Sequence, residues 1–236
     1  MCIRDRFGIP DQRLQVVYNS EDLDKLRPGS SGERFRREQG FDDSAFLVLH
    51  MGSLGLKQGL DTALQAAALI PAGEGIRWAY IGGGPELERL VALALELRVE
   101  DRVRFLPLQP AERLSEVLGA GGVCLLSQRA AVTDAVIPGK LITYMAAGRP
   151  VVASVTAQSE SGKLITTANC GLLAPPEDPK ALAGAVRLLR HDPVWAEALG
   201  ANARVFAEAH FARPAVLTAQ EQAIFELLPE RAPKKR

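Results

Sequence analysis

Short apolar runs alternate along the chain with longer stretches in which apolar residues recur every three or four positions. The runs predict buried strands, and the helical spacing between them predicts helices that cover a sheet. The predicted strands are residues 14–18, 45–51, 76–81, 103–105, 122–126, 151–153 and 171–174. Strands and helices that alternate in this way indicate parallel βαβ units with right-handed crossovers. The predicted fold class is therefore α/β, a Rossmann-like doubly wound parallel sheet.

Helix start and stop signals agree with this pattern. Asp178 and Pro179, for example, place a capping carboxylate and a first-position proline ahead of one helix. Further helices are predicted at residues 31–39, 60–70, 110–118, 138–147 and 159–169. Two extra C-terminal helices, residues 194–209 and 214–228, follow the last strand, and the basic tail at residues 229–236 is expected to be disordered.

The carboxyl ends of parallel strands meet at one edge of a sheet. A doubly wound sheet binds its ligands at that edge, near the point where the strand order reverses. Small and charged residues collect in the loops that follow the predicted strands. These loops are residues 52–59, 82–85, 127–140 and 154–162. We therefore expect the functional site at this edge.

Residues 137–154 combine a loop, a helix and a strand, and the rest of the chain is organised around them. Proline is tolerated at a first helical position, here Pro138, because the N–H that it lacks has no intrahelical partner there. The free N–H groups and partial positive charge of a helix start form a ready site for phosphate. Lys140 in the first turn is unfavourable for the helix dipole, which favours an anionic ligand over a solvated surface lysine.

Two glycine-rich loops follow the second and third predicted strands. In the first, three glycines beginning with Gly52 let the backbone approach a ligand, and Lys57 stands just before a helix. A tight turn with a solvated lysine is the alternative. Gly82 opens a triple-glycine turn like the start of a dinucleotide fingerprint, but Leu87 occupies the third glycine position of that motif. No Gly-Lys-Ser/Thr follows a glycine at the spacing of a P-loop.

Other polar residues at this edge leave alternatives open. Asp134 could orient Lys140, bind a sugar hydroxyl or face water. Glu160 lies at a predicted helix start, where a carboxylate is stabilising in any case, and a sugar or ribose contact is the functional alternative. Asp22 and Asp24 are more typical of a solvated loop than of a metal site.

Composition narrows the possible partners. The chain has 236 residues, with 28 Lys and Arg balanced by 28 Asp and Glu, so nothing in its charge indicates nucleic acid. Its three cysteines follow no metal or redox spacing, and its three histidines show no ligand or triad spacing. His50 ends a buried strand, which favours a core residue, although it could reach the cleft. No apolar run approaches the roughly 18 residues of a membrane span and no signal peptide is visible. The expected location is the cytoplasm.

Five motifs occur in the order seen in group 1, family 4 glycosyltransferases, and the chain resembles that family from about residue 15 to residue 228. The motifs are Gly52 with Lys57-Gln58-Gly59-Leu60-Asp61, Ile81-Gly82-Gly83-Gly84-Pro85-Glu86, Val103-Arg104-Phe105-Leu106, residues 144–153 and residues 171–176. They match the donor-binding, C-terminal half of the two-domain GT-B fold. The motifs around Lys57 and Lys140 resemble the branch of colanic-acid and related exopolysaccharide transferases.

This resemblance implies a hexosyltransferase that moves a sugar, with retention, from a GDP- or UDP-linked donor to a polysaccharide or lipid-linked acceptor. The diphosphate would lie between Lys57 and the helix start at residues 138–141, without a metal or a cofactor. The implied donor-binding residues are Gly52, Ser53, Lys57, Gly82, Asp134, Pro138, Gly139, Lys140, Leu141, Thr143 and Glu160. The catalytic residues stay unassigned.

The sequence departs from the family pattern at three positions. The family often has an arginine directly after the first glycine of the Lys57 loop, where this chain has Ser53. Two family glutamates would fall at Ala135 and Thr143, and the second of them normally contacts the ribose. We expect Lys140 to take over part of the missing cationic role.

The resemblance also implies a second Rossmann-like half that carries the acceptor and precedes residue 15. The last helix would pack on that half, which could also contact the inner face of the cytoplasmic membrane. A chain without it would bind donor but not transfer sugar. Residues 1–14 are expected to be a non-native or truncated start, because the first six residues fit no element. The alternatives are an NAD-type Rossmann oxidoreductase, a sugar-nucleotide 2-epimerase and a non-catalytic nucleotide-binding domain.

Overall fold

A computed structural model describes residue 8, residues 18–132 and residues 137–227 of the chain. Within these residues six parallel strands form a sheet in the order β3-β2-β1-β4-β5-β6. The strands are β1 (Phe46–Met51), β2 (Ile76–Ile81), β3 (Val103–Leu106), β4 (Val123–Ser127), β5 (Val151–Ser154) and β6 (Gly171–Ala174). The order reverses between β1 and β4, so the topological switch point lies between the loops that follow these two strands.

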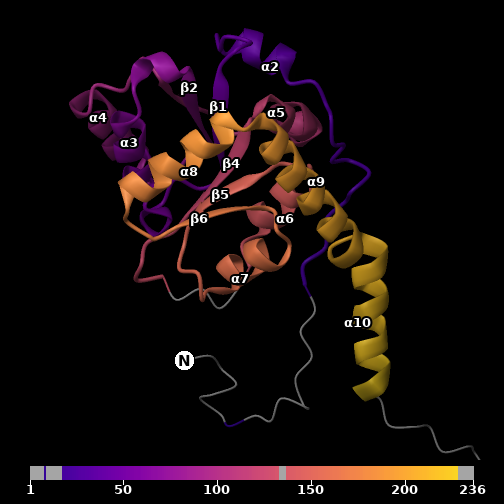
Figure 1. The fold of residues 1–236 in the computed structure, drawn as a ribbon. Coiled ribbons are helices and arrows are strands. Elements are labelled where there is room, and N and C mark those ends of the chain that lie inside the picture. The colour runs from indigo at the N-terminus through magenta and orange to yellow at the C-terminus, as the bar shows by residue number, and fades with distance from the viewer. Residues whose placement is uncertain (1–7, 9–17, 133–136, 228–236) are drawn as a thin grey trace, which may run out of the picture.

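Helices cover both faces of the sheet (Figure 1). One face carries α3 (Leu60–Leu69), α4 (Leu87–Glu96) and α8 (Pro179–His191). The other carries α2 (Glu33–Glu38), α5 (Leu114–Ala120), α6 (Gly139–Ala146) and α7 (Glu160–Thr167). α9 (Pro193–His210) contributes to both cores, and α10 (Arg213–Leu227) extends away from the sheet. This layered arrangement confirms the predicted fold class with its two extra C-terminal helices.

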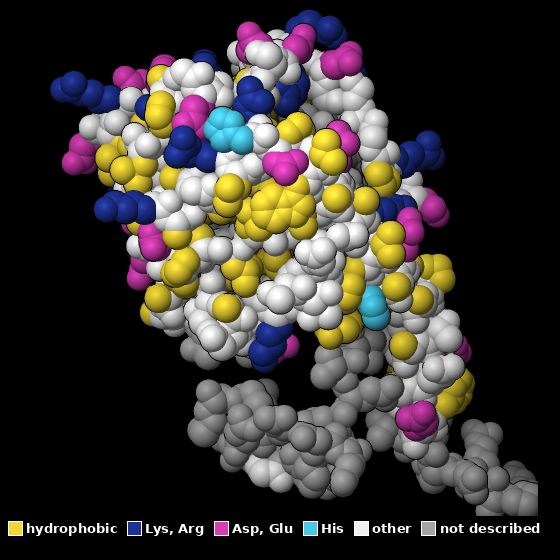
Figure 2. Space-filling view, in the orientation of Figure 1, with side chains coloured by type: hydrophobic (Ala, Val, Ile, Leu, Met, Phe, Trp, Pro, Cys, Tyr) yellow, Lys and Arg dark blue, Asp and Glu magenta, His cyan; other side chains and the backbone are white. Residues whose placement is uncertain are grey.

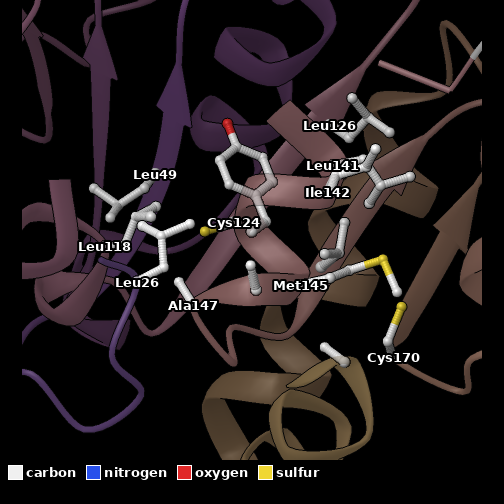
Figure 3. Packing of buried hydrophobic residues seen from close by; sticks show 14 of the residues in the cluster. Leu26, Leu49, Leu118, Cys124, Leu126, Leu141, Ile142, Met145, Ala147 and Cys170 are labelled. Atoms are coloured by element: carbon white, nitrogen blue, oxygen red, sulfur yellow. The ribbon is translucent and has the colours of Figure 1, made fainter. Parts of the chain in front are cut away.

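Successive strand residues point into opposite cores. Leu47 and Leu49 of β1 pack in the core on the α6 side, while Val48 packs in the core under α3 and α8. Figure 3 shows part of the first core, in which Leu49 lies beside Leu118 of α5 and Leu126 lies beside Leu141 and Ile142 of α6. Because every central strand is covered on both sides, the strands appear in the sequence as continuous apolar runs rather than as alternating ones.

Most predicted elements are confirmed to within one or two residues, and two helix starts need correction. The predicted helix at residues 110–118 begins with a 3-10 turn, Ala111–Arg113, before α5. α6 begins at Gly139, and Pro138 is its N-cap in an extended conformation (ψ 134°) rather than its first helical residue. Proline fixes φ but leaves ψ free, so the sequence could not distinguish these two positions.

The chain ends are less fully described. The expected disordered tail at residues 229–236 lies outside the described residues, as does the predicted start apart from Gly8. Of the predicted strand at residues 14–18 only Tyr18 is described, and it lies in no strand. Nearby, Glu21 forms an isolated parallel bridge with Ala212, which ties this early segment to the end of α9.

Charged side chains are interspersed on the molecular face shown in Figure 2, where Lys and Arg lie among Asp and Glu. This distribution agrees with the zero formal net charge of the chain. None of the helices in the described ranges is long and apolar enough to cross a membrane.

Candidate functional site at the switch point

The loops after β1 and β2 lie directly against each other. The Gly52 N–H donates to the Ile81 carbonyl (2.8 Å), and the Leu54 N–H donates to the Gly83 carbonyl (2.9 Å). Gly82 has φ +144°, and a Cβ atom there would lie only 2.0 Å from the Gly52 carbonyl oxygen. Contact between the two loops is therefore enough to require glycine at position 82, without any ligand.

Tyr144 of α6 fixes the carboxyl end of β1. Its buried hydroxyl accepts a hydrogen bond from the Met51 N–H (2.9 Å). This bond holds the start of the Gly52 loop beside the first turns of α6. A Cβ atom at Gly52 would lie 3.4 Å from Lys140 Nζ, so the structure brings these two predicted site residues together.

Lys140 is partly buried against the end of β1. Its Nζ lies 3.4 Å from Nε2 of His50, and within the described residues it forms no ion pair with a carboxylate. Burial lowers the pKa of Lys140 to about 8. At neutral pH the residue is thus an ammonium group without an opposite charge among the described residues, as a site for an anion requires.

The start of α6 offers backbone donors beside that ammonium. No side chain in the described part of the chain caps this helix, and the Leu141 N–H is already used by the Pro138 carbonyl (2.9 Å). Leu141 is completely buried, so its side chain belongs to the core. Gly139 is exposed, with open space where a Cβ would be. The N–H groups of Gly139 and Lys140 are therefore the ones placed to receive an anion.

Lys57 lies on the other side of the switch point, in a 3-10 turn (Leu56–Gln58) that ends at Gly59 with φ +54°. The Lys57 side chain is exposed and forms no hydrogen bond or ion pair with any other described residue. Its turn is held from the β4 loop, because the Arg129 N–H donates to the Lys57 carbonyl (2.9 Å) and Arg129 Nε to the Leu56 carbonyl (3.1 Å).

Arg129 itself is neutralised. Its guanidinium pairs with Asp61 (2.8 Å) and with Glu177 (3.3 Å), which raise its pKa. The sequence motifs did not single out Arg129, although a cation placed directly after a buried strand at this edge is a usable signal. Arg129 thus joins the loops that follow β1, β4 and β6, and the charge of the neighbouring Lys57 stays available to a ligand.

Thr143 lies one turn into α6, and its hydroxyl is engaged. It donates to the Glu21 carboxylate (2.7 Å) and also contacts the Gly139 carbonyl (3.2 Å). Glu21 is fixed in turn, because its N–H donates to the Phe211 carbonyl (2.8 Å). A carboxylate therefore lies beside position 143 after all, supplied by a residue 122 positions earlier in the chain that no sequence motif had singled out.

The remaining predicted site residues are less closely associated. Ser53 is exposed, and its carbonyl lies 3.4 Å from Nε2 of His50. Glu160 pairs with Lys163 (2.9 Å) on the exposed side of α7 and contacts none of the residues above. Asp134 lies outside the described residues. Asp22 pairs with Lys25 and Arg213, and the described residues include no cluster suited to a metal ion.

The fold and the edge just described define a Rossmann-like α/β protein whose candidate site lies at the switch point of a parallel sheet. Residues 31–206 match the family described as "Glycosyl transferases group 1". The chain belongs to this family, which confirms the resemblance drawn from the five motifs.

Two relatives illustrate the match. The chain is 29% identical over 170 residues to the putative colanic acid biosynthesis glycosyl transferase WcaI of Escherichia coli, covering 70% of this chain and 41% of that protein. It is 35% identical over 199 residues to D-inositol 3-phosphate glycosyltransferase of Acidothermus cellulolyticus, covering 78% of this chain and 42% of that protein. The chain thus spans less than half the length of either relative.

Solved structures are similar over nearly the whole chain. Sucrose-phosphate synthase from Thermosynechococcus elongatus has a TM-score of 0.78 at 27% identity, covering 90% of this chain and 52% of that one. Anabaena HepE in complex with UDP has a TM-score of 0.83 at 20% identity, covering 94% of this chain and 60% of that one. These neighbours are GT-B glycosyltransferases, and the second supports the shared fold alone.

Proposed function

We propose that this chain is the sugar-nucleotide-binding half of a hexosyltransferase. The observation that carries the proposal is the environment of Lys140. Lys140 belongs to the first turn of α6 and extends its partly buried ammonium to His50 and Gly52, and no carboxylate among the described residues neutralises it. A diphosphate supplies the missing negative charge and accepts from the N–H groups of Gly139 and Lys140.

The proposed reaction makes direct use of this charge. The bond between the sugar C1 and the diphosphate oxygen breaks, and its electron pair leaves with the nucleoside diphosphate. An acceptor hydroxyl forms the new bond to C1 and passes its proton to the departing diphosphate oxygen, and the proposal includes retention of the anomeric configuration. Negative charge therefore grows on the leaving group, where Lys140, the start of α6 and Lys57 are placed to stabilise it. The proposal assigns this task to lysines and includes no metal or cofactor.

The finer assignments are also proposals. The proposal includes a UDP- or GDP-linked donor; UDP is the nucleotide in the complex of Anabaena HepE, which this chain resembles in fold. The E. coli relative favours a surface polysaccharide or a lipid-linked precursor as the acceptor. Because the chain spans 41% of that relative, we assign the acceptor to the remainder of such a protein. We place the reaction in the cytoplasm, with any contact to the inner face of the membrane made through that other half.

Thermal denaturation with UDP, GDP and ADP tests the binding site. We expect one of these nucleotides at millimolar concentration to raise the melting temperature. Lys57→Ala and Lys140→Met should each remove that increase, because each deletes a cation at the diphosphate. Lys25→Ala, an exposed lysine paired with Asp22, is the matched control and should keep the increase. If no nucleotide shifts the melting temperature of the unaltered chain, the proposed function is wrong.

A further inference from the structure

His50 is a buried imidazole in contact with the cation of the proposed site. It is the fifth residue of β1, is 1% exposed, and packs beside Tyr80 of β2 with ring centroids 6.2 Å apart. Its Nε2 atom lies 3.4 Å from Lys140 Nζ and also 3.4 Å from the Ser53 carbonyl oxygen. The motifs that identify the family do not include this residue.

The ring is neutral at any working pH. Burial, and next the charge of Lys140, lower the pKa of His50 to about 3, although the carbonyls of Ser53 and Leu125 favour the protonated ring. A neutral imidazole carries one proton, on either Nδ1 or Nε2. The structure thus presents a choice between two tautomers, with different consequences for Lys140.

Only one tautomer suits the contact with Lys140. A proton on Nε2 would donate to the Ser53 carbonyl and would also point a positive N–H dipole at an ammonium group 3.4 Å away. A lone pair on Nε2 accepts from that ammonium instead and leaves the proton on Nδ1, which is buried without a hydrogen-bond partner among the described residues. The Leu125 carbonyl is the group, besides that of Ser53, that favours a proton on the ring. Since His50 is buried and Lys140 partly buried, an N–H dipole that points at a full positive charge costs more than a neutral N–H on Nδ1 without a close acceptor.

We propose that His50 is a positioning residue, whose Nε2 lone pair accepts a hydrogen bond from Lys140 Nζ and holds the ammonium over the Gly52 backbone. A neutral acceptor orients Lys140 without cancelling its charge, as a carboxylate would. The ammonium has three N–H donors, so two stay available for phosphate oxygens. This inference rests on the proposed function, because it assigns His50 the role of aiming Lys140 at a diphosphate.

None of the other described polar side chains near Lys140 is placed to orient its ammonium in the way that His50 is. From α6, Tyr144 directs its hydroxyl to the backbone of Met51. Thr143, also on α6, directs its hydroxyl to Glu21, and that carboxylate is not among the causes that shift the pKa of Lys140. From β2, the hydroxyl of Tyr80 is buried without a hydrogen-bond partner among the described residues.

Nitrogen chemical shifts of His50 in the unaltered chain test the tautomer without any substitution at the site. We expect Nδ1 to carry the proton and Nε2 to carry none between pH 6 and pH 8. Lys140→Met should then move the Nε2 signal. A proton on Nε2 would overturn the proposal, because that atom could not accept from Lys140.

Calorimetric titration with UDP, or with whichever nucleotide raises the melting temperature, tests the consequence for binding. His50→Phe keeps an aromatic ring beside Tyr80 but removes the acceptor, so we expect about tenfold weaker binding at pH 7. The pH above which binding declines should also fall, because the ammonium form of Lys140 loses a stabilising contact. His50→Gln places an amide oxygen near the former Nε2 and should restore most of the affinity, whereas His191→Phe, at an exposed histidine, is the control.

A double-mutant cycle distinguishes the orientation of Lys140 by His50 from a packing effect of the His50 ring. In a Lys140→Met background, titrated at nucleotide concentrations high enough to measure its weakened binding, His50→Phe should have no further effect on the affinity for the nucleotide. Wild-type affinity and an unchanged pH profile for a folded His50→Phe variant would overturn the inference while Lys140→Met still confirms the nucleotide site. Failure of every nucleotide to bind the unaltered chain would instead overturn the proposed function, and this inference with it.

Discussion

At the scale of single residues, Lys140 combines a binding role with a cost in stability. An unfolded chain holds this lysine at an ordinary pKa of 10.5, whereas burial lowers it to about 8 in the folded state. Between these pH values the unfolded chain binds more protons, so stability rises with pH across that interval. Below about pH 8 the buried charge of Lys140 lowers the free energy of unfolding by its full amount, of the order of 3 kcal/mol.

Replacement of Lys140 by methionine should therefore stabilise the free protein. Lys140→Met keeps much of the side-chain volume and removes the buried charge, so we expect the free energy of unfolding at pH 7 to rise by about 1–3 kcal/mol. The gain should shrink as the pH rises from 8 towards 10.5. Urea unfolding at pH 7 and pH 10 measures both effects, and a loss of stability at pH 7 would contradict the assigned burial.

Residues differ in how far the sequence reveals their roles. Lys57 and Lys140 could be predicted because each lies in or directly after the loop that follows a strand pattern and stands at a helix start. His50 and Glu21 could not, since their contacts with α6 join positions 90 and 122 residues apart. The spacing of residues along the sequence does not predict contacts between positions so far apart. In the sequence, a histidine within an apolar run is also indistinguishable from an ordinary core residue.

At the scale of elements, one hydroxyl joins β1 to α6. Tyr144 and Tyr80 are both buried, but only the Tyr144 hydroxyl has a hydrogen-bond partner among the described residues, the Met51 N–H. The two tyrosines therefore form a natural pair for measuring the value of that bond. The elements themselves were predicted well because their apolar periods are strong, whereas the 3-10 turn of Lys57 has only three residues and no period to detect.

Tyr144→Phe should cost about 1–3 kcal/mol of stability, because it leaves the Met51 N–H buried without an acceptor. Tyr80→Phe should be neutral or stabilising, since it removes a buried hydroxyl that makes no hydrogen bond. Urea unfolding of both variants measures the difference. Tyr144→Phe should also weaken nucleotide binding, because β1 no longer holds Gly52 beside Lys140. Equal destabilisation by the two variants would contradict the proposed link.

At the scale of the whole molecule, the strand order explains why the candidate site lies where it does. β1 pairs with both β2 and β4, and the loops after β1 and β4 carry Lys57 and Lys140. The sequence predicted the edge of the sheet but not this neighbour relation, because the pairing of β1 with β4 spans more than 70 residues. Right-handed crossovers restrict the possible orders without choosing among them.

The proposed division of the enzyme into a donor-binding and an acceptor-binding half leads to a prediction for the chain as a whole. The proposed site holds the nucleotide end of the donor, while nothing in the described residues is assigned to the acceptor. We therefore expect the chain to bind a UDP- or GDP-linked sugar but to release no nucleoside diphosphate beyond the rate of spontaneous hydrolysis. Chromatography of the free nucleotide over time measures this release.

Joined to an acceptor-binding half, the same chain should transfer the sugar. In that experiment proton coupling constants of the product report the anomeric configuration, and retention is the expected result. Lys57→Ala and Lys140→Met should lower kcat by at least about tenfold, since their charge stabilises the leaving diphosphate. Sugar transfer by the chain alone would contradict the division of the site. Inversion at C1 would leave the binding site intact and would instead overturn the proposed stereochemistry.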